Sequence, residues 1–255
     1  MNRIIKFIVL DILKNKIVLV YTLILSILSW SVFSLEDNST KGLLTLLNVI
    51  LLTVPLVSVV FSTIYIYNSA EFIELLLSQP VKRSKIWWSL FFGLNASLLL
   101  SFFIGTGIPI LFYAPTDVGI MMLLVGFSIT AVFVALAFLS SIITRDKAKG
   151  IGIAIMLWLF FALLFDGLIL FLLFQFADYP IEKMMVAITA FNPIDLARIL
   201  ILLHLDVSAM MGYTGAIFKE FFGTSLGIVM AFFILFLWII IPFWISLLKF
   251  KRKDL

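Results

Sequence analysis

Few residues in this sequence could do chemistry. The 255 residues contain no Cys and a single His, His204, which leaves almost no room for a thiolate nucleophile, a thiolate metal site or a histidine-built active site. The sequence also holds no H-E-x-x-H motif and no G-x-x-x-x-G-K-[ST] phosphate-binding loop, so any ATP chemistry must come from another polypeptide. The inventory predicts a non-catalytic chain with no cofactor.

Asp166 is the one carboxylate near the middle of a long apolar stretch. A charge in that position is unfavourable by at least a few kcal/mol unless it is paired, hydrated or protonated. Gly150, Ala154 and Ala162 precede it at helical spacing, which favours close contact with another helix. Asp166 could be a polar point in a dimer interface or a conduction path. The more common explanation is a structural hydrogen bond to a neighbouring helix, although no second membrane carboxylate is evident to pair with it.

Two methionine pairs near His204 raise the possibility of a copper site, because thioether sulfur suits Cu(I). However, Met often fills gaps in apolar helices, and adjacent residues on a helix point about 100° apart. Nothing in the sequence brings these side chains together, so we predict no metal site. The residues are Met184, Met185, Met210, Met211 and His204.

The composition requires a membrane. Hydrophobic residues make up 64% of the chain, charged residues only 13%, and the mean hydropathy is +1.24, which excludes a soluble fold. A membrane span needs about 20 apolar residues, and six segments are long enough. We predict an all-α, multi-pass membrane protein with spans at 17–35, 43–67, 86–111, 118–143, 150–175 and 225–248.

The distribution of basic residues predicts the orientation. An even number of spans puts both termini on one side, and that side then holds fourteen of the 18 Lys and Arg residues, as the positive-inside rule requires for the cytoplasm. The net charge of +4 is explained in this way, without nucleic acid. We expect an inner-membrane protein with both termini cytoplasmic. The inside residues are Arg3, Lys6, Lys14, Lys16, Lys82, Arg83, Lys85, Arg145, Lys147, Lys149, Lys249, Lys251, Arg252 and Lys253.

Residues 1–16 precede the region of the six predicted spans, 17–255, and have a different pattern. Lys14 and Lys16 interrupt the apolar run, which argues against a signal peptide. Charged residues fall on one arc of a helical wheel and Ile5, Ile8 and Ile12 fall elsewhere, which predicts an amphipathic helix on the cytoplasmic surface. The alternative is an extension of the first span.

Segment 68–85, between the second and third spans, predicts a short cytoplasmic helix. Asn68 and Glu71 resemble a capping box, and Pro80 disfavours helix at Gln79. Glu71, Glu74 and Ser78 share one face. The apolar side either docks into the groove of a cytoplasmic subunit or dips into the lipid headgroups. It consists of Phe72, Ile73, Leu76 and Leu77.

A stripe of small residues marks the third span. Gly93, Ser97, Ser101 and Gly105 recur at every fourth position, which predicts a packing seam and permits close backbone approach and interhelical hydrogen bonds. The sequence does not tell which helix this seam meets.

Segment 176–224 is too long for a simple connector and too interrupted for further spans. Asn192, Pro193 and Asp195 are typical of an N-cap, a first helical residue and a first-turn carboxylate, so a helix should begin there and run to about Asp206. Its length suits an interfacial or re-entrant helix rather than a span. We expect the outward partner surface to comprise Asn192, Pro193, Asp195, Arg198 and the loop to Glu220.

The short cytoplasmic segment resembles the coupling helix of type-two ABC transporter permeases, in which a glutamate-led helix ends in a Pro and a basic pair. The matching residues are Glu71, Glu74, Leu75, Leu76, Pro80 and Arg83. The stretches at 192–200, 212–216 and 250–255, with Trp238 and Pro242, are similar to one branch in particular, the NosY permeases that serve nitrous oxide reductase.

This resemblance implies a six-helix permease that forms a homodimer and pairs with a separate cytoplasmic ABC ATPase of the NosF type. It also implies a periplasmic, carbohydrate-binding-like partner of the NosD type and a role in assembling the copper site of the reductase. The ATPase contact would fall on Glu71, Phe72, Glu74, Leu76, Leu77, Pro80 and Arg83.

Three other functions compete with this interpretation. A type-two exporter of lipid, drug or polysaccharide would have the same spans and the same coupling helix. An intramembrane enzyme is excluded because the sequence has no H-E-x-x-H motif, no Cys and a single His. A secondary transporter or channel would need ionisable residues along a path and internal repeats, and the sequence shows one intramembrane acid and no evident repeat.

Overall fold

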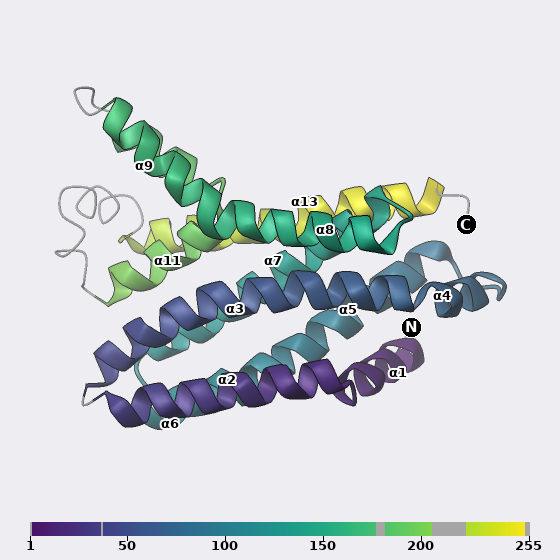
Figure 1. Ribbon diagram of the computed structural model, residues 1–255, viewed down its shortest axis with the longest axis horizontal. Coiled ribbons are helices and arrows are strands. Elements are labelled where there is room, and N and C mark those ends of the chain that lie inside the picture. The colour runs from purple at the N-terminus through teal and green to yellow at the C-terminus, as the bar shows by residue number, and fades with distance from the viewer. Residues whose placement is uncertain (1, 37, 177–181, 206–222, 253–255) are drawn as a thin grey trace.

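The computed structural model describes residues 2–36, 38–176, 182–205 and 223–252, and their regular secondary structure is entirely helical (Figure 1). Six helical segments are long and apolar enough to cross a membrane, which confirms the predicted number of spans. They are Lys16–Leu35, Ser39–Asn68, Arg83–Tyr113, Asp117–Ile143, Lys147–Leu172 and Ser225–Arg252.

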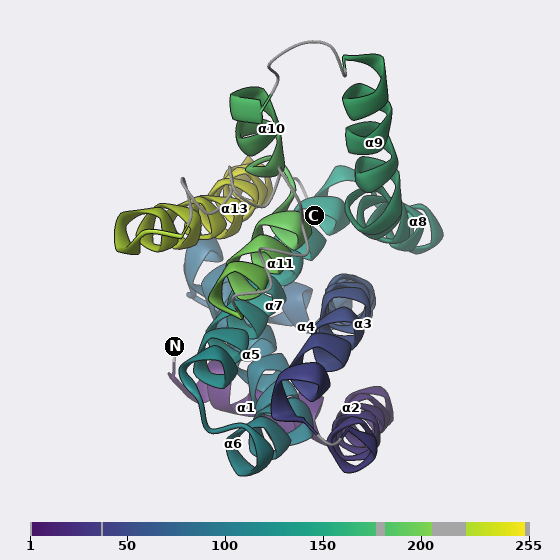
Figure 2. The same ribbon diagram turned by 90° about the vertical axis from the view of Figure 1, so that its left-hand side faces the viewer.

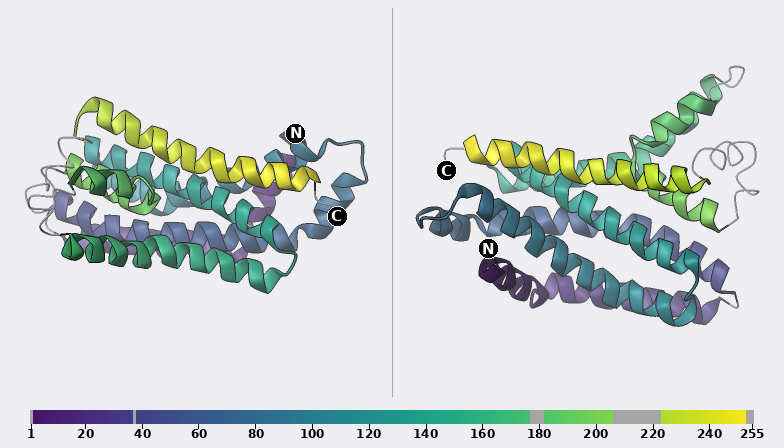
Figure 3. Two further views of the ribbon diagram at one scale, coloured as in Figure 1. Left: turned by 90° about the horizontal axis from the view of Figure 1, so that it is seen from above. Right: turned by 180° about the vertical axis from the view of Figure 1, so that it is seen from behind.

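The two ends of the helical bundle differ. Both chain termini lie at the same end, together with the short helix α4 (Ala70–Leu77), as Figures 1 and 3 show. The opposite end carries α6 (Ile108–Tyr113), α11 (Pro193–His204) and the tip of α9 (Phe165–Gln175). Because Lys and Arg follow α4 and the last span in the sequence, most of the basic residues gather at the end where α4 lies.

Helix α7 (Asp117–Ile143) forms the centre of the fold. It packs against α3 (Ser39–Asn68), α5 (Arg83–Phe102), α11 and α13 (Ser225–Arg252), which surround it in Figure 2. A helix that is apolar on every side is expected to be buried, and 72% of the most apolar stretch of α7 lies inside the chain, against 28% for α2 (Lys16–Leu35) and 22% for α13.

Two of the spans are interrupted by a π-helical turn. The third span consists of α5, η1 (Phe103–Gly107) and α6, and the fifth of α8 (Lys147–Leu159), η2 (Phe160–Leu164) and α9. In the third span the ring of Pro109 would clash with the carbonyl of Gly105 in a regular helix, and a wider turn relieves that clash. Beyond η2, α9 turns away from the bundle in Figure 1.

The N-terminal helix is separate from the first span. Helix α1 (Asn2–Leu13) ends before Asn15, whose Oδ1 accepts a hydrogen bond of 2.9 Å from the Ile17 amide and so caps α2. Ile8 and Ile12 are fully buried while Lys6 and Asp11 are exposed, as the helical wheel predicted. A break at residues 14–15 thus separates α1 from α2. The position of α1 at the membrane surface stays a prediction.

The small-residue stripe of the third span meets α1 and α2 of the same chain. A Cβ added at Gly93 would lie 2.5 Å from Cγ2 of Ile8, and one at Gly105 would lie 2.8 Å from Cβ of Leu25. The hydroxyl groups of Ser97 and Ser101 donate to carbonyls one turn earlier in their own helix, at 2.8 and 3.0 Å. Among the described residues, these serine hydroxyls bond within their own helix, so close packing rather than interhelical hydrogen bonding marks the seam there.

Candidate functional site

Helix α4 is the predicted short helix between the second and third spans, but it is not held by the predicted capping box. Its N-cap is Ser69, which makes no side-chain cap hydrogen bond. Asn68 is instead the last residue of α3, and its Oδ1 accepts a hydrogen bond of 2.7 Å from Lys147 Nζ at the start of α8. The capping-box prediction is wrong because Asn68 is the last residue of α3, and Ser69 instead occupies the N-cap position of α4.

The apolar side of α4 is covered by the chain itself. Ile73 and Leu76 are buried, Leu77 is partly buried, and the ring of Phe72 stacks on Phe7 of α1 at a centroid distance of 5.4 Å. The chain itself therefore covers Ile73 and Leu76, and the prediction that another protein or the headgroups must cover them is wrong, whereas Phe72 and Leu77 stay partly exposed. Sequence spacing showed the patch but could not show that α1 and α5 lie beneath it.

The exposed face of α4 is mostly polar. Glu71, Glu74 and Ser78 are exposed, as their shared spacing predicted, and Leu75 is the apolar side chain among them, with 66% of its surface exposed. Pro80 is also exposed, in the turn that leads to α5. A partner that approaches α4 from the end of the bundle meets two carboxylates around one leucine.

Arg83 links this region to the C-terminal helix. It is the first residue of α5, and its Nη1 donates a hydrogen bond of 3.3 Å to the backbone carbonyl of Lys251 in α13. The basic residue of the sequence motif thus holds two spans together at their ends. The ring of Trp87, one turn further into α5, stacks on Phe250 at 4.2 Å, and its Nε1 donates to Oγ of Ser246 at 3.0 Å.

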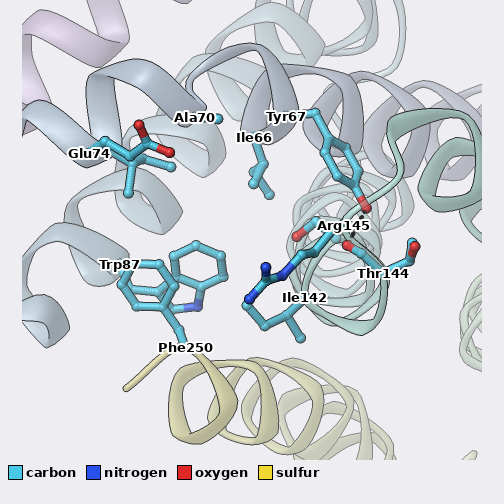
Figure 4. A pocket seen from close by; sticks show the side chains of 11 residues that line it. Ile66, Tyr67, Ala70, Glu74, Trp87, Ile142, Thr144, Arg145 and Phe250 are labelled. Carbon is cyan, nitrogen blue, oxygen red and sulfur yellow. Dashed lines mark hydrogen bonds between the residues drawn. The ribbon is translucent and has the colours of Figure 1, made fainter. Parts of the chain in front are cut away.

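A cavity of about 250 Å³ lies directly behind α4 (Figure 4). Tyr67 and Ile73 line it from α3 and α4, Trp87 and Phe250 from α5 and α13, and Arg145 from the connection between α7 and α8. In Figure 4 the Arg145 guanidinium extends into this space. Five elements therefore meet around this cavity, and α4 forms one of its walls.

The wall of this cavity is fixed by Tyr67. Its hydroxyl group donates a hydrogen bond of 3.0 Å to the carbonyl of Thr144, which joins the end of α3 to the end of α7. Its ring lies over Gly150 of α8, where an added Cβ would overlap the ring atoms. The small residue at 150 is therefore explained by the tyrosine that packs on it.

A second group of polar residues lies at the other end of the bundle. Arg198 Nη1 is 3.1 Å from Asp166 Oδ2 in α9 and 3.3 Å from Asp195 Oδ1 in its own helix, α11. Asn192 Nδ2 donates to Asp195 Oδ2 and to the backbone carbonyl of Phe161, both at 2.8 Å. The carbonyl of Phe161 belongs to η2, so Asn192 binds a backbone group in the π-helical turn. We call Asp166, Asn192, Asp195 and Arg198 the polar cluster.

The charges in the polar cluster do not balance, because two carboxylates share one guanidinium group. Burial and the neighbouring Asp166 carboxylate raise the pKa of Asp195 to about 7, while Arg198 and Asn192 act in the opposite direction. Asp195 lies in α11, outside the six spans. The cluster can therefore take up a proton near neutral pH.

The polar cluster corrects two predictions. Asn192 and Asp195 are 0% and 5% exposed, so they cannot form an outward surface for a partner, and Pro193 is buried with them. Asp166 does have a second carboxylate beside it, in addition to its ion pair with Arg198. Asp166 thus makes a polar bond to a neighbouring helix, and its role in an interface or a conduction path stays a prediction. The helix predicted to begin at Pro193 is present, with Asn192 as its N-cap.

Comparison with known proteins identifies the family. The model of the family described as ABC-2 family transporter protein matches residues 8–255, nearly the whole chain. The chain belongs to the ABC-2 transporter family. This ABC-2 permease is also 32% identical, over 149 residues, to the probable ABC transporter permease protein NosY of Pseudomonas aeruginosa. The match covers 54% of this chain and 54% of that relative, so it spans about half the length of each protein.

Several predicted residues of this permease are not part of either site. Met184 is exposed on α10 (Glu182–Thr189), which also contains Met185, and His204 is exposed at the end of α11. Met210, Met211 and Glu220 lie outside the described residues. Within the described part of the chain, no three His, Cys, Asp or Glu side chains gather in a way that could hold a metal ion.

Sequence reasoning missed the residues that join the elements of this permease. Tyr67, Trp87 and Arg145 around the cavity were not predicted, and neither was the pairing of Asp166 with Arg198. A signal for the pairing existed, because a lone acid in one apolar stretch and a lone Arg in another each require a partner. The aromatic residues near span ends carried no comparable signal.

Proposed function

We propose that this permease couples ATP hydrolysis by a separate cytoplasmic ATPase to the extracytoplasmic maturation of the copper site of nitrous oxide reductase. As a member of the ABC-2 family, the chain is the membrane subunit of an ABC transporter and contains no ATPase motif of its own. The finer role rests on its similarity to the protein named NosY and on the sequence stretches quoted above.

The observation that carries the coupling proposal is the position of α4. It lies at the end of the bundle that holds the termini, it presents Glu71 and Leu75 outward, Glu74 is exposed at the edge of the cavity, and its apolar side packs on the chain's own helices. A force applied to the outer face would therefore pass into α1, α5 and the cavity wall. A helix anchored in this way suits the transmission of motion better than one that floats on the membrane.

The orientation follows from charge. The end that holds α4 carries Lys82 and Lys85 and the basic residues of the α7–α8 connection and of the last span, whereas the opposite end of the described chain has Lys41, Lys183 and Arg198. By the positive-inside rule, this distribution supports a cytoplasmic location for α4 and both termini in an inner-membrane protein. The polar cluster and α11 belong to the outward half.

The proposed complex contains a second copy of this permease, a NosF-like ATPase and a NosD-like periplasmic protein. The outward contact must avoid the buried Asn192 and Asp195. Exposed candidates in the described chain are Phe191, with 68% of its surface exposed, and Met184 on α10. The segment with Glu220 remains part of the proposed partner surface.

A second candidate is an ABC-2 exporter of another cargo, and one feature favours an apolar cargo such as a lipid. A hollow of about 400 Å³ lies between the 190–191 turn and α13, and its lining is apolar: Ala190, Phe191, Ile234, Leu237, Trp238, Ile241 and Pro242. Binding sites for apolar ligands have this character.

Purification of the tagged permease in mild detergent, from cells that express all three proposed partners, tests the proposal. Recovery of the ATPase together with the periplasmic protein, and loss of copper from the reductase when the permease is deleted, are the expected results. Recovery of the ATPase alone, with normal copper content in the reductase, would favour the exporter of another cargo.

The coupling contact has its own test in a charge reversal. Glu71→Lys with Glu74→Lys should reduce retention of the ATPase and its hydrolysis rate in the complex, because both carboxylates lie on the exposed face of α4. Lys41→Glu is the control, since it reverses an exposed charge at the opposite end. Full retention of the ATPase by the double variant would show that α4 is not the contact.

A further inference from the structure

The fifth span bends at its π-helical turn, and the part beyond the bend exposes most of its apolar side chains. The turn η2 separates α8 from α9, and α9 diverges from α11 and α13 in Figures 1 and 2. Sharp bends in helices commonly arise at π-turns. Phe165 at the start of α9 is buried, whereas Leu168, Phe171 and Phe174 have 45, 64 and 83% of their surface exposed. Packing of these three side chains therefore does not fix the direction of α9.

The bend itself is held by two neighbouring helices. Asn192 of α11 donates a hydrogen bond to the Phe161 carbonyl in η2. The ring of Trp238 in α13 meets the Phe161 ring edge-on at a centroid distance of 5.3 Å, and its Nε1 donates a hydrogen bond of 3.1 Å to the carbonyl of Ala190, just before α11. Helix α11 packs on the central helix α7. Because η2 is attached to the centre of the fold, a change of shape in this span would be a rotation of α9 about η2.

One ion pair joins α9 to α11 just beyond the bend. Asp166 lies in the first turn of α9 and is the only charged residue in its sequence, and its Oδ2 is 3.1 Å from Nη1 of Arg198. At 1.5 Å per residue, Phe171 lies about 14 Å from the middle of η2. A change of about 20° in the bend would therefore move Phe171 by about 5 Å. A contact two residues past η2 thus controls the position of the whole of α9.

Asp195 weakens this ion pair when it is charged. Nη1 of Arg198 is also 3.3 Å from Asp195 Oδ1, so two carboxylates compete for one guanidinium group. When a proton from water converts the Asp195 carboxylate into a neutral acid, that competition ends, and the acid can donate a hydrogen bond to the Asp166 carboxylate. Because burial and Asp166 raise the pKa of Asp195 to about 7, this change takes place near neutral pH.

The groups that act on the Asp195 carboxyl belong to the polar cluster itself. Asp166, Arg198 and Asn192 are the side chains that shift its pKa. About a third of the Asp166 and Arg198 side chains is exposed, and ionisable side chains within a span face water or protein rather than lipid, which gives a proton access. The other charged or titratable residues of α11 and of the helices packed on it lie toward the ends of these helices: Lys41, Tyr65, Tyr67, Asp117, Glu182, Lys183, His204 and the basic last turn of α13.

We propose that the Asp166–Arg198 ion pair sets the angle between α8 and α9, and that uptake of a proton by the polar cluster strengthens this pair. Arg198 is then a positioning residue, which holds the outward half of the fifth span at low pH and releases it at high pH. The proposal goes beyond the proposed function, because it concerns a single chain and requires neither the ATPase nor copper maturation.

Distances measured by double electron–electron resonance in the purified permease test the first part. The chain has no Cys, so Phe171→Cys with Leu124→Cys places two spin labels at exposed positions of α9 and α7. Met156→Cys with Leu124→Cys is the matched control, because Met156 is exposed on α8, before the bend. Dilution with unlabelled permease keeps the measured distances within one chain. Arg198→Gln should shift or broaden the α9–α7 distance by about 5 Å and leave the α8–α7 distance unchanged.

The pH dependence of the same distance tests the role of the proton. With Arg198 in place, the α9–α7 distance distribution should be narrower at pH 5.5 than at pH 8.5. Asp195→Asn removes the titrating carboxyl and should give the narrow distribution at both pH values.

Three results would overturn the proposal. An unchanged α9–α7 distance in Arg198→Gln would show that the ion pair does not set the angle of α9. Equal changes in the α9–α7 and α8–α7 distances would indicate a general loss of structure instead of a rotation about η2. The same distribution at both pH values, or a narrower one at pH 8.5, would refute the role of the proton. None of these measurements involves the ATPase or the reductase, so they are decided separately from the proposed function.

Discussion

Replacement of Gly105 by Ala tests the packing of the third span on α2. An added Cβ would lie 2.8 Å from Cβ of Leu25 and 3.0 Å from the backbone carbonyl oxygen of Thr22. Carbon atoms pack at about 3.5–4.0 Å, so the two helices must separate by about 0.7 Å or more at this point. Because one of the obstacles is backbone, a change of side-chain rotamer cannot relieve the overlap.

The expected magnitude follows from two opposing terms. Overpacking of a well-packed contact is unfavourable by about 1–3 kcal/mol, and Ala is about 1 kcal/mol better than Gly in a helix interior. Gly152→Ala provides the matched control, since no heavy atom lies within 4 Å of an added Cβ there. The helix-propensity gain is common to both variants, so their difference in stability, about 1–3 kcal/mol, measures the overpacking.

The assay is equilibrium unfolding of the purified permease by SDS in mixed micelles, followed by tryptophan fluorescence. Gly105→Ala should unfold at a lower SDS fraction than the wild type, and Gly152→Ala at the same fraction or a higher one. If the two variants unfold together, the close contact between η1 and α2 does not exist in the folded protein and the described seam is wrong.

Three further predictions concern polar groups. Arg198→Gln should destabilise the fold by about 1–3 kcal/mol. This loss is smaller than that expected on breaking a fully buried ion pair, because about a third of each partner is exposed. Adding Asp166→Asn should restore part of the stability, and equal SDS midpoints for the single and double variants would contradict the ion pair. Because the pKa of Asp195 is raised to about 7 when folded, its contribution to stability is complete below its ordinary pKa and is lost as the pH rises through about 7. Thermal unfolding should therefore show higher stability at pH 5.5 than at pH 8.5, and an equal pH dependence in Asp195→Asn would refute this assignment. Trp87→Phe keeps the ring stack on Phe250 but loses the hydrogen bond to Ser246, which should destabilise the fold by about 1 kcal/mol. A double-mutant cycle with Ser246→Ala should give a coupling energy of about the same size. A coupling energy of zero would argue against the hydrogen bond.

The spans and the short helices were predictable because their signals are local. Twenty apolar residues between charged ends define a span whatever surrounds them. Asn192 and Pro193 define the start of α11 through backbone groups only one or two residues away. The same local logic placed α4 before Pro80, and the helix does end at Leu77.

The contacts between elements could not be predicted in the same way. The apolar side of α4 was visible in the sequence, but its partner, Phe7, lies more than sixty residues earlier. The π-helical turn at Phe160–Leu164 has no proline to announce it, and the Asn192 side chain that binds its carbonyl comes from α11. Such contacts depend on how the helices pack in space, which spacing along one chain does not determine.

The burial of α7 constrains how this permease can change shape. Moving α7 away from α3 and α13 would open voids inside the chain, and each Å³ of void is unfavourable by about 24 cal/mol. Only 11% of the most apolar stretch of Lys147–Leu172 is buried inside the chain. A sideways shift of that span would therefore replace some contacts with lipid hydrocarbon by other contacts with lipid hydrocarbon, at little free-energy change. We therefore expect the resting and ATP-driven conformations to share α7 as a stationary axis and to differ in the placement of the peripheral fifth span.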